Sequence, residues 1–264
     1  MLGFSHGRQN EPAGARGYRA YVVGDVHGRL DLLEDLLAKI HAELQHRPAS
    51  KTLLVFVGDL IDRGPQSAQV IERLRTYRRK GIQPIFILGN HEEVLLRILK
   101  GEAQLITKWR WFGGSECLES YGVDPEALGG MGDDEARAVV RSAIPKDHVE
   151  FLESFIDSCR FGDFLFVHAG IRPGIALGQQ AQSDLRWIRE PFLLDDTDHG
   201  FVVVHGHTIS NGVDERSNRV GIDTGAYRSG ILTALAIEGT QRWLIDTRPQ
   251  MEAAAAIDSP PPPE

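Results

Sequence analysis

Six polar side chains, each at or just beyond the end of a short apolar run, are of the types that bind transition metals. Mixed carboxylate, imidazole and carboxamide ligands suit Mn²⁺, Fe or Zn²⁺, whereas a set made only of oxygen ligands suits Mg²⁺ or Ca²⁺. Six groups are enough for two ions if one carboxylate bridges them, and Asp59 is the natural candidate for the bridge. The six residues are Asp25, His27, Asp59, Asn90, His168 and His207.

Two divalent ions about 3.5–4 Å apart can hold and deprotonate a water molecule and neutralise the oxygens of a phosphoryl group. The sequence therefore predicts a metal-dependent hydrolase of phosphate esters. A covalent phosphoenzyme is not indicated, because neither Cys117 nor Cys159 begins a Cys-x₅-Arg loop. A phosphate-binding loop of the GxxxxGK[ST] type is absent from the sequence as well.

Five short apolar runs place the polar residues where the ends of strands are expected to meet. Each run is rich in Val, Ile, Leu or Phe and leads into Asp, Asn or His. Because open α/β sheets bind ligands at the carboxyl ends of their strands, five such endings predict convergence on one site. The runs are 18–23, 53–57, 84–88, 164–167 and 201–204.

The segments between these runs have the periodicity of helices. Leucines at a spacing of three or four residues predict an amphipathic helix over 30–45. Strands that alternate with helices predict an α/β fold, and the later apolar runs are candidates for a second sheet. Helices are also expected at 66–80 and 92–100, and later strands at 220–223, 231–238 and 241–246.

A single catalytic domain is expected over residues 18–246. Residues 101–150 are rich in glycine and partly acidic, and we expect them to be an insertion on the substrate side of the site. The polar segment 1–17 is predicted to be a flexible lead-in. The segment 247–264, which is rich in alanine and proline, is predicted to be disordered.

The order of five motifs resembles that of the calcineurin-like metallophosphoesterases. The motifs are GDVHG at 24–28, GDLIDRGP at 58–65, GNHE at 89–92, HAG at 168–170 and VHGHT at 204–208. The DRGP and HAG segments are similar to the phosphoprotein-phosphatase branch of that family, which includes diadenosine tetraphosphatases. The resemblance implies a β-sandwich flanked by helices, in αββα layers, with a dinuclear metal site that most often holds Mn²⁺. It implies two ligand sets that share Asp59: Asp25, His27 and Asp59 on one metal, and Asp59, Asn90, His168 and His207 on the other.

The resemblance also implies the groups that act on the phosphate. His91 would be the general acid that protonates the leaving oxygen, and Asp62 would orient its ring and raise its pKa. Arg63 would clamp the phosphate oxygens with its planar guanidinium. The second clamp of the family follows a tryptophan after the HAG motif, which matches Arg189, with Arg186 as a rival.

Three of the polar residues also have simpler interpretations. Asp25 could be the N-cap of the helix that follows it. His205 is expected on the opposite face of its strand from His207, where it would pack or support a ligand. Asp223 could either support the metal ligands or simply form a turn after a strand.

Charge and composition limit the partners. The net charge of −8 argues against a nucleic-acid surface, so Trp109, Trp111 and Trp187 are expected to pack rather than to stack on bases. The sequence contains no run of about 18 apolar residues, so no membrane span is predicted. Two unpaired cysteines and the lack of a signal-peptide pattern predict a cytoplasmic protein.

Three functions remain open at this level. The first is a serine/threonine phosphatase that acts on a phosphoprotein, a phosphopeptide or a small phosphoester, and Thr208 after the final histidine leans slightly toward it. The second is hydrolysis of dinucleoside polyphosphates such as diadenosine tetraphosphate at the same metal site. The third, of another class, is a non-catalytic phosphate-binding module.

Overall fold

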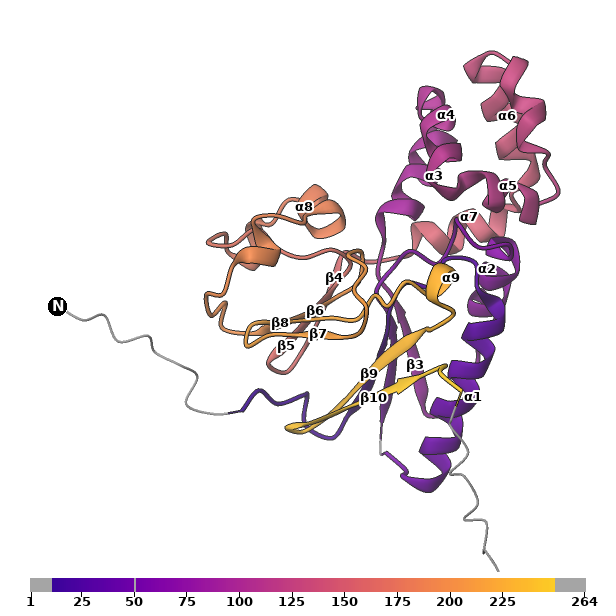
Figure 1. Cartoon of the computed structure of the whole chain (residues 1–264). Helices are drawn as coiled ribbons and strands as arrows, with labels where there is room; N and C mark the ends of the chain where they lie inside the picture. Colours follow the sequence, from indigo (N-terminus) through magenta and orange to yellow (C-terminus); the bar gives the residue numbers. More distant parts are fainter. Residues whose placement is uncertain (1–10, 50, 250–264) are drawn as a thin grey trace, which may run out of the picture.

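Two five-stranded sheets pack face to face in the computed structural model, which describes residues 11–49 and 51–249 (Figure 1). In the first sheet β1, β2 and β3 are parallel, and β9 and β10 add antiparallel strands at the β1 edge. Its order is β10 (Gln241–Asp246), β9 (Thr233–Glu238), β1 (Arg19–Val23), β2 (Thr52–Phe56) and β3 (Ile82–Phe86). The order of the second sheet is β4 (Ser158–Phe161), β5 (Phe164–Val167), β6 (Val202–His205), β8 (Arg219–Gly221) and β7 (Asp214–Glu215).

The alternation of side chains along β1 shows how the layers form. Ala20 and Val22 point into the core between the sheets, while Tyr21 and Val23 point into the core beneath the helices. Both faces of the strand are buried, as expected for the centre of a sheet covered on two sides. The core between the sheets contains, among others, Val55, Val57, Phe164, Phe166, Val202, Val204 and Leu235.

Helices cover the outer faces of both sheets. The first sheet is covered by α1 (Leu30–His46), α2 (Ser67–Arg75) and α3 (Asn90–Lys100), whose apolar faces join one large cluster. The second is covered by the short helix α8 (Gln182–Trp187) and two 3₁₀ turns, Leu177–Gln179 and Phe192–Leu194. The result is the predicted α/β sandwich with αββα layers.

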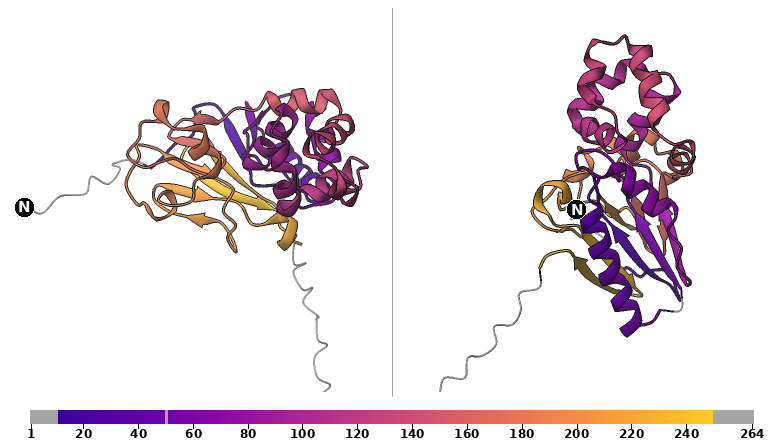
Figure 2. Two further views of the ribbon diagram at one scale, coloured as in Figure 1. Left: turned by 90° about the horizontal axis from the view of Figure 1, so that it is seen from above. Right: turned by 90° about the vertical axis from the view of Figure 1, so that its right-hand side faces the viewer.

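Residues 101–150 form a group of short helices above the first sheet (Figure 2). The sequence predicted an insertion here but not its helical structure, because these helices are short and broken by glycine. They are the 3₁₀ turn Ala103–Leu105, α4 (Ile106–Trp109), the π-helical turn Arg110–Gly114, α5 (Ser115–Ser120), the 3₁₀ turn Pro125–Gly130, α6 (Asp133–Ala143) and α7 (Lys146–Glu153). A last short helix, α9 (Ala226–Ser229), follows the second sheet.

Several elements differ from their predicted bounds, the helix expected over 66–80 most of all. The helix predicted over 66–80 ends at Arg75, and Gly81 with a φ of 83° then turns the chain into β3. The strand predicted over 84–88 begins two residues earlier, and Ile87 pairs with Ile156 beyond its end.

The chain ends lie partly outside the described residues. Of the predicted lead-in 1–17, the part from residue 11 is described, and it is held against the domain. The N–H of Ala13 donates to Asp163, and the N–H of Gly14 donates to the Gly239 carbonyl. Most of the predicted tail, from residue 250, is not described. The described residues contain no helix with the length and apolarity that a membrane span requires.

Candidate active site

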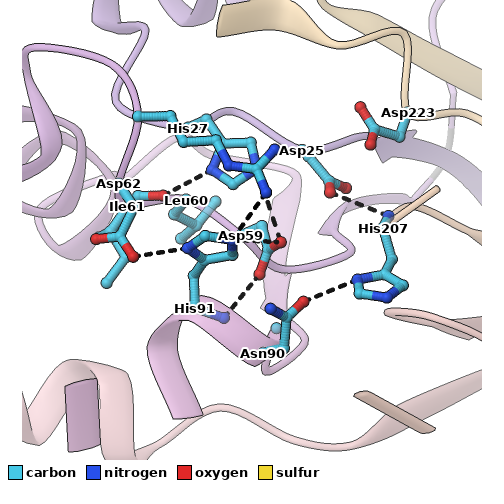
Figure 3. Close-up of polar contacts among 12 residues, drawn as sticks. Asp25, His27, Asp59, Leu60, Ile61, Asp62, Asn90, His91, His207 and Asp223 are labelled. Atoms are coloured by element: carbon cyan, nitrogen blue, oxygen red, sulfur yellow. Dashed lines mark hydrogen bonds and ion pairs between the residues drawn. The ribbon is translucent and has the colours of Figure 1, made fainter. Parts of the chain in front are cut away.

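The ends of the strands converge at one edge of the sandwich, and all six predicted metal ligands lie there, buried. Figure 3 shows Asp25, His27, Asp59, Asn90 and His207 of this group. The turns after β1 and β2 carry Asp25, His27 and Asp59, and α3 begins with Asn90. The second sheet supplies the other two ligands, because His168 follows β5 and His207 follows β6. Asp25 is not a helix cap, since α1 begins at Leu30 after Arg29.

Asp59 lies at the centre of the group. Its Oδ1 is 3.4 Å from His168 Nε2, and its Oδ2 is 3.7 Å from His27 Nε2. Each carboxylate oxygen therefore faces a different imidazole, as a bridging ligand requires. Two triads of ligand atoms share it, each within 4.8 Å: His27, Asp59 and His91, and Asp59, His168 and His207.

Backbone carbonyls orient two of the imidazoles. His27 Nδ1 lies 2.8 Å from the Ile61 carbonyl oxygen, and His168 Nδ1 lies 2.8 Å from that of Val57. Because a carbonyl only accepts, each Nδ1 carries a proton, and Nε2 is the ring nitrogen that faces Asp59 and could bind a metal. Histidines that bind metals in proteins are oriented in this way.

Buried atoms without partners fit metal ligation. Within the described part of the chain, Asp25 Oδ1 and His207 Nε2 are both buried without a hydrogen-bond partner. Asn90 Oδ1 lies 2.8 Å from His207 Nδ1 and 2.9 Å from His168 Nε2. An unpartnered buried polar atom is costly, so a donor set of this kind fits two divalent cations.

The electrostatics of the site agree with this interpretation. Burial alone would raise the pKa of Asp59, but the charges of His168 and His91 hold it well below its ordinary value. Burial, and next to it the charge of a neighbouring histidine, lowers the pKa of His27 and that of His207 to about 3. Both rings are therefore neutral at physiological pH, which is the form that binds metal.

His91 is placed for a different role. Its Nδ1 lies 2.6 Å from Asp62 Oδ2, and its Nε2 lies 3.3 Å from a guanidinium nitrogen of Arg63 and 3.9 Å from Asp59 Oδ2. Burial opposes its charged form, but the charge of Asp59 and the hydrogen bond to Asp62 raise the pKa of His91 to about 9. His91 thus lies at the edge of the metal site with a raised pKa, although it also belongs to one of the ligand triads.

A cavity of about 320 Å³ opens beside these residues. Arg189 lines it, whereas the Arg186 guanidinium pairs with Asp157 at 2.6 Å, so the geometry favours Arg189 as the second clamp. Trp109 is buried as predicted, but Trp111 is 86% exposed and Trp187 42% exposed, so the prediction that all three pack was wrong. The other walls of the cavity include Val94, Arg97, Leu105, Lys108 and Phe112.

The two residues with open interpretations have distinct environments. His205 points away from the metal ligands, with its ring 5.2 Å from that of Phe192 in an edge contact. Asp223 accepts a hydrogen bond from the Gly225 N–H, which is the predicted turn. It also lies close enough to Asp25 for its charge to raise the pKa of that carboxyl further, after burial. Asp223 therefore forms the predicted turn, and its support of the metal ligands stays a prediction.

Sequence reasoning missed Glu92 and Tyr227. The Glu92 carboxylate is fully buried and accepts hydrogen bonds from the N–H groups of Asp59, Leu60 and Gly89, so it ties the turn after β2 to the start of α3. Its place three residues after Gly89 is that of a capping box, which was the available signal. The ring of Tyr227 lies under the Arg63 guanidinium at 4.8 Å and against His27, and no motif marks it.

Similarity to known proteins identifies the family to which this chain belongs. Residues 18–233 match the family described as calcineurin-like phosphoesterase. The chain belongs to the calcineurin-like phosphoesterases. A crystal structure provisionally named diadenosine tetraphosphatase superposes with a TM-score of 0.62, at 22% identity, over 89% of this chain and 98% of its own, which shows the shared fold.

Two curated members of the family are equally similar in sequence. An asymmetrical bis(5'-nucleosyl)-tetraphosphatase of Anoxybacillus flavithermus is 27% identical over 81% of this chain and 88% of its own. Serine/threonine-protein phosphatase 2 of Escherichia coli is 27% identical over 85% of this chain and 95% of its own. Sequence identity therefore does not distinguish the tetraphosphatase from the protein phosphatase as a guide to the substrate.

Replacing Gly113 with alanine is expected to lower kcat/KM about 10- to 100-fold, through displacement of Arg63. Gly113 has a φ of 107°, its carbonyl accepts a hydrogen bond from the Arg63 N–H, and an added Cβ would lie 2.6 Å from that nitrogen. Steady-state kinetics with p-nitrophenyl phosphate measures the effect. Gly129→Ala, in the 3₁₀ turn Pro125–Gly130, is the control, because its Cβ would meet nothing within 4 Å. Equal kinetics for the two variants would contradict the role of this contact.

Proposed function

We propose that this chain hydrolyses phosphoric esters or anhydrides at a dinuclear metal centre. The observation that carries the proposal is the Asp59 carboxylate, with one oxygen toward each of two imidazoles that backbone carbonyls orient. Two divalent cations held by the six ligands would supply Lewis acidity and lower the pKa of a coordinated water. The mixed nitrogen and oxygen donors suit Mn²⁺, with Fe and Zn²⁺ as alternatives.

The remaining groups would act on the phosphate. Arg63 and Arg189 would bind the nonbridging oxygens, for which a planar guanidinium is suited. His91, held by Asp62, would donate the proton of its Nε2 to the leaving oxygen. These roles require no further residue from the second sheet.

The walls of the cavity favour a nucleotide substrate over a phosphoprotein. Phe112 and Trp187 present aromatic faces that are 53% and 42% exposed, and Lys108 lies beside Phe112. Stacking of a base on such a face is worth about 1–3 kcal/mol. We therefore propose a dinucleoside polyphosphate such as diadenosine tetraphosphate, which offers both bases and a chain of phosphates. The cavity thus favours a different substrate class from the phosphoproteins that the sequence slightly favoured.

A serine/threonine phosphatase is the second candidate. Thr208 follows the ligand His207, and the relative from Escherichia coli carries that activity in its name. The same ligands and the same acid would serve a phosphoserine, so only the groups beyond the metal site separate the two candidates.

A substrate panel with Mn²⁺-loaded protein tests both proposals. We expect kcat/KM for diadenosine tetraphosphate to exceed that for a phosphoserine peptide, and Trp187→Leu to lower the former about 10-fold while leaving the latter within 2-fold. Trp243→Leu is the control, because Trp243 bonds to Glu43 away from the cavity. A preference for the peptide would favour the phosphatase. No turnover of either substrate would contradict the hydrolase and favour the non-catalytic binding module.

A further inference from the structure

Trp109 contacts the group that orients the proposed general acid. It is the last residue of α4, only 2% of it is exposed, and its indole Nε1 donates a hydrogen bond of 2.8 Å to Asp62 Oδ2. The same oxygen lies 2.6 Å from His91 Nδ1. We propose that Trp109 is a positioning residue: its indole N–H fixes the Asp62 carboxylate and, through it, the ring of His91. The inference rests on the proposed function, in which His91 is the acid.

The surroundings of Asp62 leave its carboxylate dependent on this bond. Asp62 is fully buried, and its own N–H is held by Ser67 Oγ at 2.9 Å, so the backbone is fixed. Among the described residues its Oδ1 has no close hydrogen-bond partner, and the two nitrogen donors, His91 and Trp109, both lie on Oδ2, with the Cys117 thiol as a further, weaker contact. Two donors on one oxygen set the rotation of the carboxylate, and loss of one would let it turn about its Cβ–Cγ bond.

The neighbouring thiol does not replace the indole. Cys117 is buried beside Asp62, and burial together with the charge of Asp62 raises the pKa of this thiol well above its ordinary value. It therefore stays a neutral thiol, which is a weak donor compared with an indole N–H. A bond between a neutral N–H and a carboxylate is among the stronger hydrogen bonds in proteins.

The glycine pair that follows α4 is shaped for this position of the indole. A Cβ on Gly114 would lie 2.5 Å from Cδ2 of the Trp109 ring, so the ring lies directly against this backbone. Gly113 makes the corresponding close contact with Arg63. One turn of the helical segment thus holds both the orienting group of the acid and the first phosphate clamp.

Simple packing of Trp109 in the core would predict a different pattern of defects. A packing defect slows all substrates alike, whereas a misplaced acid slows only those whose leaving group needs a proton. We therefore compare Trp109→Phe with wild-type protein, both loaded with Mn²⁺, on phenyl phosphate and on 2,4-dinitrophenyl phosphate. Phenylalanine keeps an aromatic ring and removes the N–H.

The expected result is a loss that depends on the leaving group. On phenyl phosphate kcat should fall about 10- to 100-fold with KM within 2-fold, and on 2,4-dinitrophenyl phosphate kcat should stay within about 3-fold. In a His91→Asn background Trp109→Phe should cause no further loss, because it acts through His91. Trp243→Phe, which also loses an indole hydrogen bond, is the matched control and should leave both rates unchanged.

Other outcomes overturn the inference or the function, and they can be told apart. An equal loss on both substrates, or a loss that adds to that of His91→Asn, would overturn the positioning role. Wild-type protein inactive on both substrates would instead contradict the proposed function. If Trp109→Phe does not fold, NMR can test the contact instead. In protein with Trp111, Trp187 and Trp243 replaced by Phe, the single indole N–H resonance belongs to Trp109. An Asp62→Asn change that leaves this resonance in place would overturn the contact.

Discussion

Asp59→Asn is expected to abolish stable metal loading and to lower kcat/KM by about 10³-fold or more. The carboxylate places one oxygen toward His168 and the other toward His27, and no other described residue stands between both imidazoles in this way. Asparagine keeps the shape but replaces one oxygen with an amide nitrogen and removes the negative charge, so it cannot bridge two cations. Elemental analysis of purified, Mn²⁺-loaded protein measures the loss directly, and turnover of p-nitrophenyl phosphate measures its consequence.

The control for this change is Asp31→Asn, which removes an exposed carboxylate that pairs with Arg29 on the first turn of α1. It should keep both the metal content and the rate of the wild-type protein. Two metals per chain in Asp59→Asn would show that this residue is not the bridge. The His27 and His91 triad would then have to hold its ion without it.

His91→Asn is expected to keep both metals and to lower kcat about 10²- to 10⁴-fold on a substrate with a poor leaving group. The ring is held at 2.6 Å by Asp62, and the charge of Asp59 together with this bond raises the pKa of His91 to about 9, against burial. Asparagine at this position cannot transfer a proton to the leaving oxygen. The rate on 2,4-dinitrophenyl phosphate, whose leaving group needs no proton, should change far less.

His41→Asn is the matched control, because His41 bonds to the Tyr77 hydroxyl at 2.9 Å on the helical side of the domain. Its kinetics should equal those of the wild-type protein on both substrates. An unchanged rate for His91→Asn on phenyl phosphate would remove His91 from the mechanism. A drop in metal content would instead make it a ligand, as its place in one triad allows.

The positions of the metal ligands could be predicted because each follows an apolar run. Parallel neighbours end at the same edge of a sheet, so the endings after β1 and β2 meet, and so do those after β5 and β6. That the two pairs of endings meet each other depends on how the two sheets pack, which the pattern of apolar runs does not give. His205 does point away from His207, but alternation is not the reason, because residues two apart lie on the same face of a strand. The strand β6 ends at His205, and the chain turns at His207, which has a φ of 63°.

The contacts that tune the site could not be predicted in the same way. Glu92 accepts hydrogen bonds from four backbone N–H groups, those of Asp59, Leu60, Ile61 and Gly89, and such a contact depends on how the two turns that carry them pack. The role of Trp109 depends on a helical segment without clear periodicity. The exposure of Trp111 and Trp187 depends on the open side of the cavity, which hydrophobicity alone does not reveal.

The ligands belong to both halves of the sandwich. The first sheet and α3 supply Asp25, His27, Asp59 and Asn90, whereas the second sheet supplies His168 and His207. In the sequence, His207 lies more than a hundred residues after Asn90. The first sheet carries all three residues proposed for one metal, but the other metal also needs His168 and His207 from the second sheet, so a fragment that holds only one sheet cannot assemble the dinuclear centre. The proposed metal site therefore lies at the junction of the two sheets. If one sheet slid against the other, the ligands would move apart while the hydrogen bonds within each sheet stayed intact.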